Sequence, residues 1–413
     1  MQVCIHRGAK EIGGSCVEIE TKGQSLLLDL GLPLDAALNE TPLPDVSGLN
    51  CIDESLLGIA ISHAHLDHYG LMAKLRQKVP VFIGDGAIRI INAARQFFPD
   101  IPAFPNTIGL RDREPISRGP FIIIPYLVDH SAYDAYAFLI EADGKKVFYS
   151  GDFRGHGRKA KLFYRLVKNP PPDVDILLME GSTLGRTATD NEYPSEDELE
   201  DRLINIFQSA NGLTLVWTSG QNIDRIVTIY RACRKSGKKL IVDLYSANIL
   251  MAINNPKLPQ PGFRDFHVYV PEFQRRLIKK RGLFDIPLSV SACRVYPEKL
   301  AEMARSSVML FRPSMTKDIE RAKCLEGARL IYSLWSGYLK DGRYQWFIDW
   351  LDKHQVPIIH CHTSGHASLP DLQKLANAIS AKRLVPIHTF EPDSYKLFFD
   401  NVEKRKDGEI WTV

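Results

Sequence analysis

The spacing of hydrophobic and polar positions changes twice along the chain and divides it into three stretches. In residues 1–190, short apolar runs are separated by glycine, proline and aspartate turns, which predicts a β-rich structure. In residues 191–355, strand-like runs alternate with helical periodicity, which is typical of a parallel sheet. In residues 356–413, apolar strands again end in histidine-bearing loops. We therefore expect a core domain at 1–190 and 356–413, with an α/β domain inserted at 191–355.

The pattern also predicts individual elements in both domains. The first stretch opens with strands at 3–6, 15–19 and 25–29, and a helix is expected at 71–78 after the fourth strand. The inserted domain is expected to contain strands at 213–217, 239–243, 307–312 and 328–333, with helices at 221–234 and 246–254. The last stretch should contain strands at 357–361 and 383–388 around a helix at 369–380.

Four metal-binding side chains follow the apolar run 57–61 in the pattern H-x-H-x-D-H, as His63, His65, Asp67 and His68. Such a loop buries little apolar area and crowds groups that need polar partners or a metal ion. Imidazole and carboxylate ligands suit zinc, or manganese where oxygen ligands dominate. His63 and His65 leave the strand in the same direction and can chelate one ion. Asp67 and His68, at the start of the next helix, can turn toward a second ion.

Other apolar strands also end in polar residues that can bind metal or move protons. These residues are Asp129 and His130, Asp152, Glu180, His362 and His388. An isolated histidine at such a place is more often a core or surface residue than a ligand. Their order behind the H-x-H-x-D-H pattern makes a shared metal site the better interpretation.

The H-x-H-x-D-H pattern after a strand resembles the hallmark of the metallo-β-lactamase fold. That family stacks two β-sheets between outer helices and holds one or two metal ions at the sheet edge. The resemblance implies an α/β fold of the αββα sandwich type. It does not name the reaction, since lactamases, glyoxalases, lactonases and nucleases share this fold.

The inserted domain makes the chain resemble the β-CASP nucleases, in which a β-CASP domain lies over the metal site and the substrate enters between the two domains. Three motifs of that family match in order. Glu180 in Leu-Leu-Met-Glu-Gly-Ser-Thr fits motif A, His366 in Ser-Gly-His-Ala fits motif B, and His388 in Pro-Ile-His fits motif C. The last two motifs, and the segment 217–226, are most similar to the ribonuclease J branch.

The resemblance is incomplete in two respects. Leu66 stands where ribonuclease J usually has an acidic residue, and we expect no counterpart of its C-terminal domain, because the chain ends soon after His388. The segments around Asp152 and Tyr69 also resemble DNA-repair nucleases of the Artemis type. Those enzymes typically carry valine at motif C, whereas RNA-processing members carry histidine. His388 therefore favours RNA over DNA.

The resemblance implies a role for each candidate residue. Two divalent ions, bridged by Asp152, would be held by His63, His65 and His130 on one side and by Asp67, His68 and His388 on the other. Asp29 would support the metal-binding loop from behind the ligands. Asp67, Glu180 and His366 would serve catalysis, with His366 binding the scissile phosphate or donating a proton. Neighbouring phosphates would be bound by Ser364, Gly365 and His362.

Composition indicates the cellular compartment but not the substrate. The 413 residues carry a net charge of +3, so any basic surface must be local, as in the clusters at 231–239 and 275–281. Such clusters are often only a solvated helix face. Seven scattered cysteines without a C-x-x-C motif predict a protein of the reducing cytoplasm, and the apolar runs are too short to span a membrane.

The sequence therefore predicts a two-metal phosphodiesterase that hydrolyses nucleic acid, with RNA as the favoured substrate. An Artemis-type DNA nuclease, a small-molecule hydrolase of the same fold and a non-catalytic scaffold remain as alternatives. The choice between zinc and manganese, between internal and 5′-terminal cleavage, and between monomer and oligomer stays open at this point.

Overall fold

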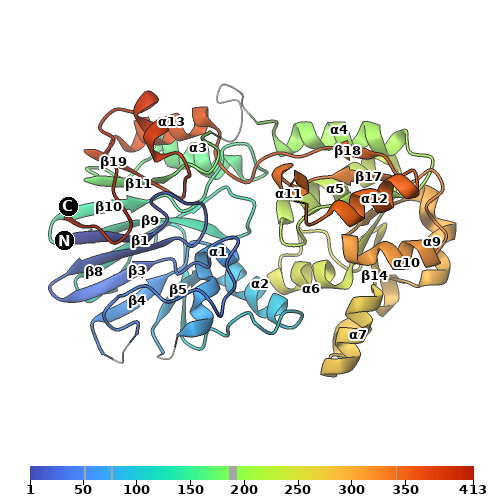
Figure 1. The fold of residues 1–413 in the computed structure, drawn as a ribbon, viewed down its shortest axis with the longest axis horizontal. Helices are drawn as coiled ribbons and strands as arrows, with labels where there is room; N and C mark the ends of the chain where they lie inside the picture. The colour runs from blue at the N-terminus through green and yellow to red at the C-terminus, as the bar shows by residue number, and fades with distance from the viewer. Residues whose placement is uncertain (51–52, 76–77, 186–192, 341) are drawn as a thin grey trace. The chain divides into compact units, whose positions relative to one another are not determined.

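The computed structural model describes residues 1–50, 53–75, 78–185, 193–340 and 342–413. The chain forms two compact units, each with its own core (Figure 1). The first unit joins Met1–Tyr193 to Gly365–Val413, and the second is Pro194–Ser364. The second unit is therefore an insertion in the sequence of the first.

Two β-sheets form the centre of the first unit. The first sheet has the order β20-β1-β2-β3-β4-β5-β6, and its strands are β1 (Gln2–Arg7), β2 (Cys16–Thr21), β3 (Gln24–Leu28), β4 (Leu56–Ala60), β5 (Val81–Gly84), β6 (Thr107–Leu110) and β20 (Ile410–Thr412). The second has the order β19-β11-β10-β9-β8-β7, and its strands are β7 (Ile116–Arg118), β8 (Phe121–Val128), β9 (Ala135–Ala142), β10 (Lys145–Tyr149), β11 (Ile176–Glu180) and β19 (Arg383–Ile387).

Helices cover the outer faces of this pair of sheets (Figure 1). They are α1 (Leu66–Tyr69), α2 (Asp85–Arg95), α3 (Ala160–Lys168) and α13 (Leu369–Ile379), with 3₁₀ turns at Gly70–Lys74 and Pro392–Leu397. The helix expected at 71–78 is instead α1 followed by the first 3₁₀ turn. His68 therefore lies within α1, and the extended backbone of Leu75 ends the 3₁₀ turn.

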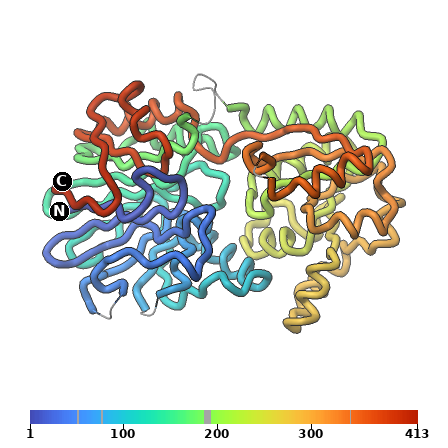
Figure 2. Tube along the Cα trace, viewed as in Figure 1, coloured from blue at the N-terminus to red at the C-terminus, as the bar shows by residue number. Residues whose placement is uncertain are grey.

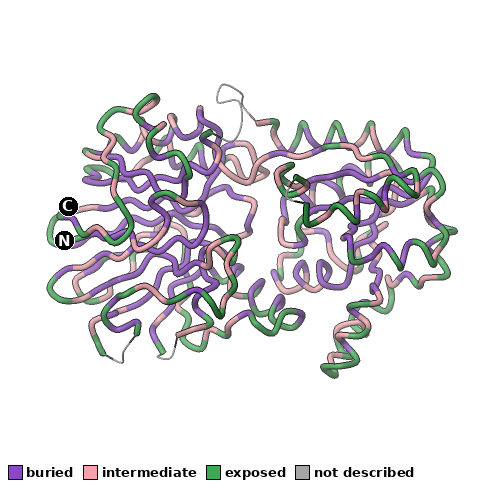
Figure 3. Tube along the Cα trace, in the orientation of Figure 1, coloured by how far each residue is buried: buried purple, intermediate pink, exposed green. Residues whose placement is uncertain are grey.

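Strand β9 shows why this sequence makes a layered structure. Tyr136, Phe138 and Ile140 are buried between the two sheets, whereas Ala137 and Leu139 are buried against the layer of α3 and α13. Successive side chains of a strand point to opposite faces, so a strand buried on both faces needs apolar residues at every position. The expected αββα sandwich is therefore confirmed, and Figure 3 shows its buried strands between more exposed helices.

The second unit is built on a seven-stranded sheet in which every pairing is parallel. Its order is β15-β14-β13-β16-β12-β17-β18, and the strands are β12 (Thr214–Trp217), β13 (Lys239–Asp243), β14 (Phe266–Tyr269), β15 (Arg294–Val295), β16 (Ser307–Leu310), β17 (Arg329–Tyr332) and β18 (Ile358–His360). The connecting helices are α4 (Glu196–Gln208), α5 (Ile223–Ser236), α6 (Leu244–Ile253), α7 (Glu272–Arg281), α8 (Asp285–Ser289), α9 (Pro297–Met303), α10 (Thr316–Arg321), α11 (Gly337–Lys340) and α12 (Gln345–Lys353).

The second end of the inserted unit differs from the expected boundary. The boundary expected between residues 190 and 191 lies outside the described residues. Strand β18 was expected to return to the first domain, but it pairs in parallel with β17 and completes the sheet of the second unit. The return to the first unit therefore comes at Gly365, because strand pairing cannot be read from the apolar run alone.

The insertion separates two strands that are direct neighbours. Strand β11 ends at Glu180, and β19, which pairs with it in parallel, begins only at Arg383. Strand β20 likewise pairs with β1, so the two termini lie side by side (Figure 2). The second sheet of the first unit therefore contains strands that come before the second unit in the sequence and one strand, β19, that comes after it.

Candidate metal centre

Four strands of the second sheet deliver their functional side chains to the same edge. Strands β8, β10, β11 and β19 run in one direction, with only β9 antiparallel between β8 and β10. The residues at or just beyond the ends of these strands are His130, Asp152, Glu180 and His388. From the first sheet, the loop after β4 and helix α1 bring His63, His65, Asp67 and His68 to the same place.

The carboxylate of Asp152 lies at the centre of this group. Its Oδ2 atom is 3.1 Å from Nε2 of His68 and 3.7 Å from Nε2 of both His63 and His388. Nε2 of His130 lies 4.0 Å from the same oxygen. His65 joins the group through Nδ1, which is 3.0 Å from Nε2 of His63. Nδ1 of His366 is also 3.7 Å from Oδ2, so this one carboxylate oxygen is surrounded by ring nitrogens from five histidines.

Asp67 lies on one side of this centre. Its Oδ2 is 3.8 Å from Nε2 of His68 and 3.9 Å from Nε2 of His388. The candidate ligand atoms fall into overlapping sets, each spanning no more than 4.8 Å, and all seven predicted ligands belong to at least one set. The sets are His63–His65–His130, His63–His68–Asp152, Asp67–His68–His388 and His130–Asp152–His366.

Buried atoms without hydrogen bonds show that the residues fit metal ions. Oδ1 of Asp152 and Nε2 of His388 are both buried and have no hydrogen-bond partner among the described residues. A buried polar atom left unpaired is costly, unless a cation takes the place of the missing partner. The cluster thus has the composition and the unsatisfied lone pairs of a site for divalent metal ions.

The surroundings keep most of the imidazoles neutral, which is the form that binds metal. Burial lowers the pKa of His65 to about 4 and holds the pKa values of His63 and His130 well below the usual imidazole value. Burial also lowers the pKa of His388. The pKa of Asp152 is well below its usual range, because His388 and His68 outweigh the opposing effect of burial. The carboxylate is therefore ionised.

Asp29 accepts four hydrogen bonds directly behind the metal-binding loop. Its Oδ1 accepts from the backbone N–H of Ser62 at 2.7 Å, and its Oδ2 accepts from Ser62 Oγ at 2.8 Å and from Tyr149 Oη at 2.7 Å. Nδ1 of His68 also lies 2.7 Å from Oδ2. A carboxylate that accepts from Nδ1 leaves Nε2 with a lone pair directed at the cluster. Ser62 and Tyr149 were not expected as partners.

The backbone at His388 is shaped for its position. Its φ of +53° places it in the left-handed region, which few residues other than glycine adopt. The backbone N–H donates to Gly8 O at 2.7 Å, and Ser15 Oγ lies 2.8 Å from Nδ1. These contacts orient the ring so that Nε2 points at the two carboxylates.

Gly31 allows the metal-binding loop to approach the first sheet closely. A Cβ atom at this position would lie only 1.7 Å from the carbonyl oxygen of Asp67. That carbonyl accepts from the backbone N–H of Ser15 at 3.1 Å, so the loop cannot move away without losing a hydrogen bond. Only glycine fits, and Asp67 is thereby held beside the cluster.

Glu180 connects the centre to His366. Its Oε2 lies 3.1 Å from Nδ1 of His366, while its Oε1 accepts from the backbone N–H of Phe153, next to Asp152, at 3.0 Å. Ser182 Oγ also donates to Oε2 at 2.7 Å. Burial works against the protonated form of His366, but Glu180 and Asp152 raise the pKa of His366 to about 9. With 28% of its side chain exposed, His366 is the most accessible of the histidines that lie within 4.0 Å of Asp152.

A buried ion pair joins two of the strand ends. Nε of Arg154 lies 3.5 Å from Oδ1 of Asp129, and both side chains are fully buried. The backbone N–H of Arg154 also donates to the carbonyl of Asp129 at 2.7 Å. Because Asp129 precedes His130 and Arg154 follows Asp152 by two residues, the pair fixes the spacing of two predicted ligands. The sequence analysis named Asp129 as a polar residue at a strand end but did not anticipate this ion pair.

The three residues expected to bind phosphates do not lie in one unit. Gly365 is in the first unit, where an added Cβ would lie 2.6 Å from Ser131 Oγ and 3.8 Å from a ring carbon of His130. His362 and Ser364 belong to the second unit, where Nδ1 of His362 lies 3.5 Å from Nη1 of the buried Arg225. Phosphate binding by these three residues stays a prediction.

Tyr149→Phe should weaken metal binding although Tyr149 is not a ligand. Removing its hydroxyl takes one donor from Asp29 and loosens the ring of His68, and losing such a supporting contact typically costs about 10- to 100-fold in metal affinity. Competition with a chromophoric chelator would measure this loss. Tyr332→Phe is a matched control, since Tyr332 is buried in the second unit and donates to Trp335 O. Equal affinity in both variants would contradict the role of Tyr149.

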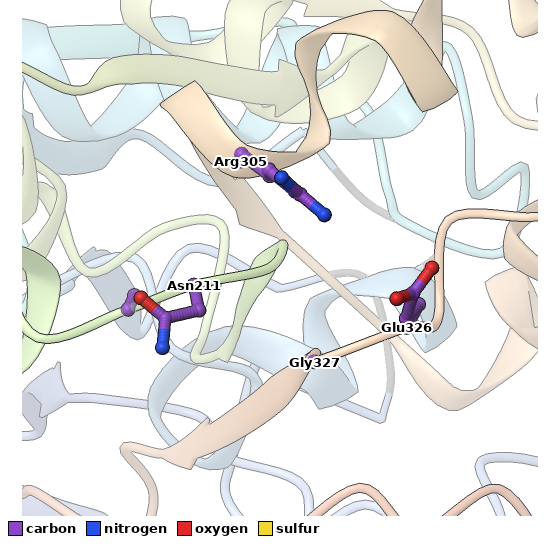
Figure 4. A pocket seen from close by; sticks show the side chains of 5 residues that line it. Asn211, Arg305, Glu326 and Gly327 are labelled. Carbon is purple, nitrogen blue, oxygen red and sulfur yellow. The ribbon is translucent and has the colours of Figure 1, made fainter.

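A hollow in the second unit is a poorer candidate for a site. It is lined by Ala210, Asn211, Arg305, Glu326 and Gly327, and Figure 4 labels four of them, Asn211, Arg305, Glu326 and Gly327. The residues precede β12, β16 and β17, so the hollow lies at the amino ends of these parallel strands. Ligands of open parallel sheets bind at the carboxyl ends instead, and the hollow contains none of the candidate ligands.

Part of the chain matches a known protein family. A sequence profile described as the beta-lactamase superfamily domain matches residues 41–187, which include the metal-binding loop, His130 and Asp152. A crystal structure of a protein of unknown function from Enterococcus faecalis V583 matches all of this chain with a TM-score of 0.81, 22% identity and 99% of its own length. That likeness establishes the fold of the whole chain.

The particular relatives are ribonucleases J. Ribonuclease J of Helicobacter pylori strain 26695 is 27% identical over 253 residues, which are 57% of this chain and 35% of that protein. Ribonuclease J of Mycobacterium tuberculosis H37Rv is 22% identical over 399 residues, covering 92% of this chain and 67% of the relative. That of Synechocystis is 24% identical over 404 residues, covering 92% and 59%. The resemblance inferred from the motifs is thus confirmed, although the chain spans only about a third of the Helicobacter proteins.

Proposed function

We propose that this protein is a metal-dependent nuclease that hydrolyses the phosphodiester bonds of RNA. The observation that carries the proposal is the position of Asp152, whose Oδ2 lies within 4.0 Å of ring nitrogens of His63, His68, His130 and His388. One carboxylate with ligands on both sides suits a pair of divalent ions, with zinc favoured by the number of imidazoles. The similarity to ribonucleases J supports RNA as the substrate.

In this proposal, each group of residues has a separate task. His63, His65 and His130 would hold one ion, Asp67, His68 and His388 would hold the other, and Asp152 would contact both. Two such ions would activate a water molecule and neutralise charge on the oxygens of the phosphodiester. Asp29 keeps the ring of His68 in place through Nδ1.

His366 is the proposed proton donor or phosphate-binding group. Glu180 fixes its Nδ1, and its partial exposure allows it to meet a substrate. Ser364, Gly365 and His362 would contact neighbouring phosphates. The residues therefore divide into those that hold metal and those that act on the phosphate.

No helix in the described ranges is long and apolar enough to cross a bilayer. The six described cysteines, Cys4, Cys16, Cys233, Cys293, Cys324 and Cys361, all carry free thiols. Such thiols suit a reducing compartment, and we propose the cytoplasm.

The decisive experiment compares RNA and DNA strands of the same sequence, each labelled at its 5′ end. The purified protein, loaded with zinc or manganese, should cut the RNA, and a chelator should abolish cleavage. Asp67→Ala serves as the inactive control. Faster cleavage of the DNA strand would favour the Artemis-type alternative. Hydrolysis of a small thioester or lactam without cleavage of either strand would favour a small-molecule hydrolase instead.

A further inference from the structure

Positive charge is concentrated in one segment of the second unit. Residues 272–296 contain six basic and two acidic residues, a net charge of +4, whereas the entire chain has only +3. This segment, named here the basic arm, comprises α7, α8 and the strand β15. The remainder of the chain is therefore slightly acidic, and the arm is a local site of attraction for anions.

The basic arm contacts its own unit through a narrow face. Helix α7 buries only Gln274 and Ile278, which lie one turn apart. Gln274 donates to Asp243 Oδ1 at 3.1 Å and fixes the start of the helix. Figure 1 shows α7 extending away from the sheet of this unit, and Figure 3 shows that its far end is mostly exposed.

Some basic side chains of α7 form ion pairs and others do not. Arg275 lies 3.5 Å from Asp318, and Arg276 pairs with Glu272. Lys279 and Lys280 are exposed and form no ion pair with any described residue. The last turn of α7 therefore presents uncompensated positive charge to solvent.

The basic arm also carries exposed aromatic and apolar side chains. Phe273 is 37%, Phe284 60%, Leu288 69% and Tyr296 51% exposed. The guanidinium of Arg294 lies 4.8 Å from the ring centroid of Tyr296, which gives a stacked pair at the surface. Rings next to cations are the features by which proteins bind single-stranded nucleic acid, since rings stack on bases and cations contact phosphates.

Building on the nuclease function proposed above, we propose that the basic arm is a binding surface for single-stranded RNA. Lys279 and Lys280 contact phosphates, while Phe284 and Tyr296 stack on bases. A second copy of this chain does not suit the surface, because two arms of charge +4 repel each other. A lipid surface does not suit it either, because α7 offers no continuous apolar face.

The first test removes charge from the arm of the full-length, metal-loaded protein. The probe is a phosphorothioate-linked single-stranded RNA, whose linkages resist hydrolysis. Lys279→Gln/Lys280→Gln should weaken binding roughly tenfold at low salt, and the slope of log affinity against log salt should become shallower by about 1.4, since each phosphate contact on a single strand contributes about 0.7. Lys257→Gln/Lys353→Gln removes the same charge from exposed positions elsewhere in the second unit and should change affinity by less than about twofold.

The second test removes a ring. Phe284→Ala should weaken RNA binding roughly tenfold without changing the salt slope, because stacking is not electrostatic. Leu397→Ala, at another highly exposed apolar position, is the control. Hydrolysis of bis(p-nitrophenyl) phosphate should be unchanged in all four variants, since this small diester needs only the metal centre.

The outcomes separate this inference from the proposed nuclease function. Loss of RNA affinity in the arm variants supports the inference even if the protein cuts no strand. Equal affinity in Lys279→Gln/Lys280→Gln and its control overturns it even if RNA is cleaved. It is also overturned if the double variant changes only the binding of anionic vesicles or only the sedimentation mass.

Discussion

Asp152→Ala is expected to remove most of the bound metal and, with it, the nuclease activity proposed above. The Oδ2 atom of Asp152 is the only oxygen that lies within 4.0 Å of both His63 and His388 among the described carboxylates. Without it, Asp67 would be the one carboxylate left beside the five imidazoles of the seven candidate ligands. Less negative charge would then offset the repulsion between two bound metal ions. Metal content per chain and cleavage rate should be measured on the same preparation.

A matched control is Asp175→Ala. Asp175 is also a buried carboxylate of the first unit, but it accepts from Lys382 and from the backbone of Lys146 instead of from histidines. This variant should keep its metal and its activity per folded molecule. Metal content like that of the unmodified protein in Asp152→Ala would refute the bridging role.

His366→Ala and His388→Ala should fail in different ways. His366 is held by Glu180 and is partly exposed, so its loss should leave the metal in place and slow cleavage by roughly 10²- to 10⁴-fold, as for other positioned acid–base groups. His388 is buried, and its unpaired Nε2 faces Asp67 and Asp152, so its loss should empty or weaken part of the metal centre. Metal analysis, RNA binding and cleavage rate together distinguish the two results.

His354→Ala provides the control for removing an imidazole. His354 lies in the second unit and contacts Glu320 at 3.0 Å, outside the metal centre. This variant should match the unmodified protein in all three measurements. If His366→Ala loses its metal, or cleaves at the unmodified rate, then its assignment to phosphate chemistry is wrong.

That most residues of the candidate metal centre lie together could be predicted from the sequence, because they occupy strand ends. Apolar runs predict strands, and polar residues directly after them predict a shared edge. The order of His63, His130, Asp152 and His388 then matched a known family pattern. The sequence did not reveal that β8, β10, β11 and β19 all run in one direction. This shared direction brings His130, Asp152 and His388 together.

The supporting residues could not be predicted for a physical reason. Tyr149 ends an apolar run, and its pattern is that of an ordinary core aromatic. Its hydroxyl matters only because the fold places it 2.7 Å from Asp29, which is far away in the sequence. The same limit applied to β18, whose apolar residues fit either sheet. Periodicity shows which residues are buried, but not which partner buries them.

The pairing of β11 with β19 has a consequence for how the chain is made. About 200 residues separate these neighbouring strands, so at roughly 5–20 residues per second a ribosome needs about 10 to 40 s to produce β19 after β11. During that time β11 has an unpaired edge, and the position of His388 is vacant. Protein synthesis thus delays completion of the metal centre until the second unit has been made, and the nascent chain has to be protected from edge-to-edge association in the meantime.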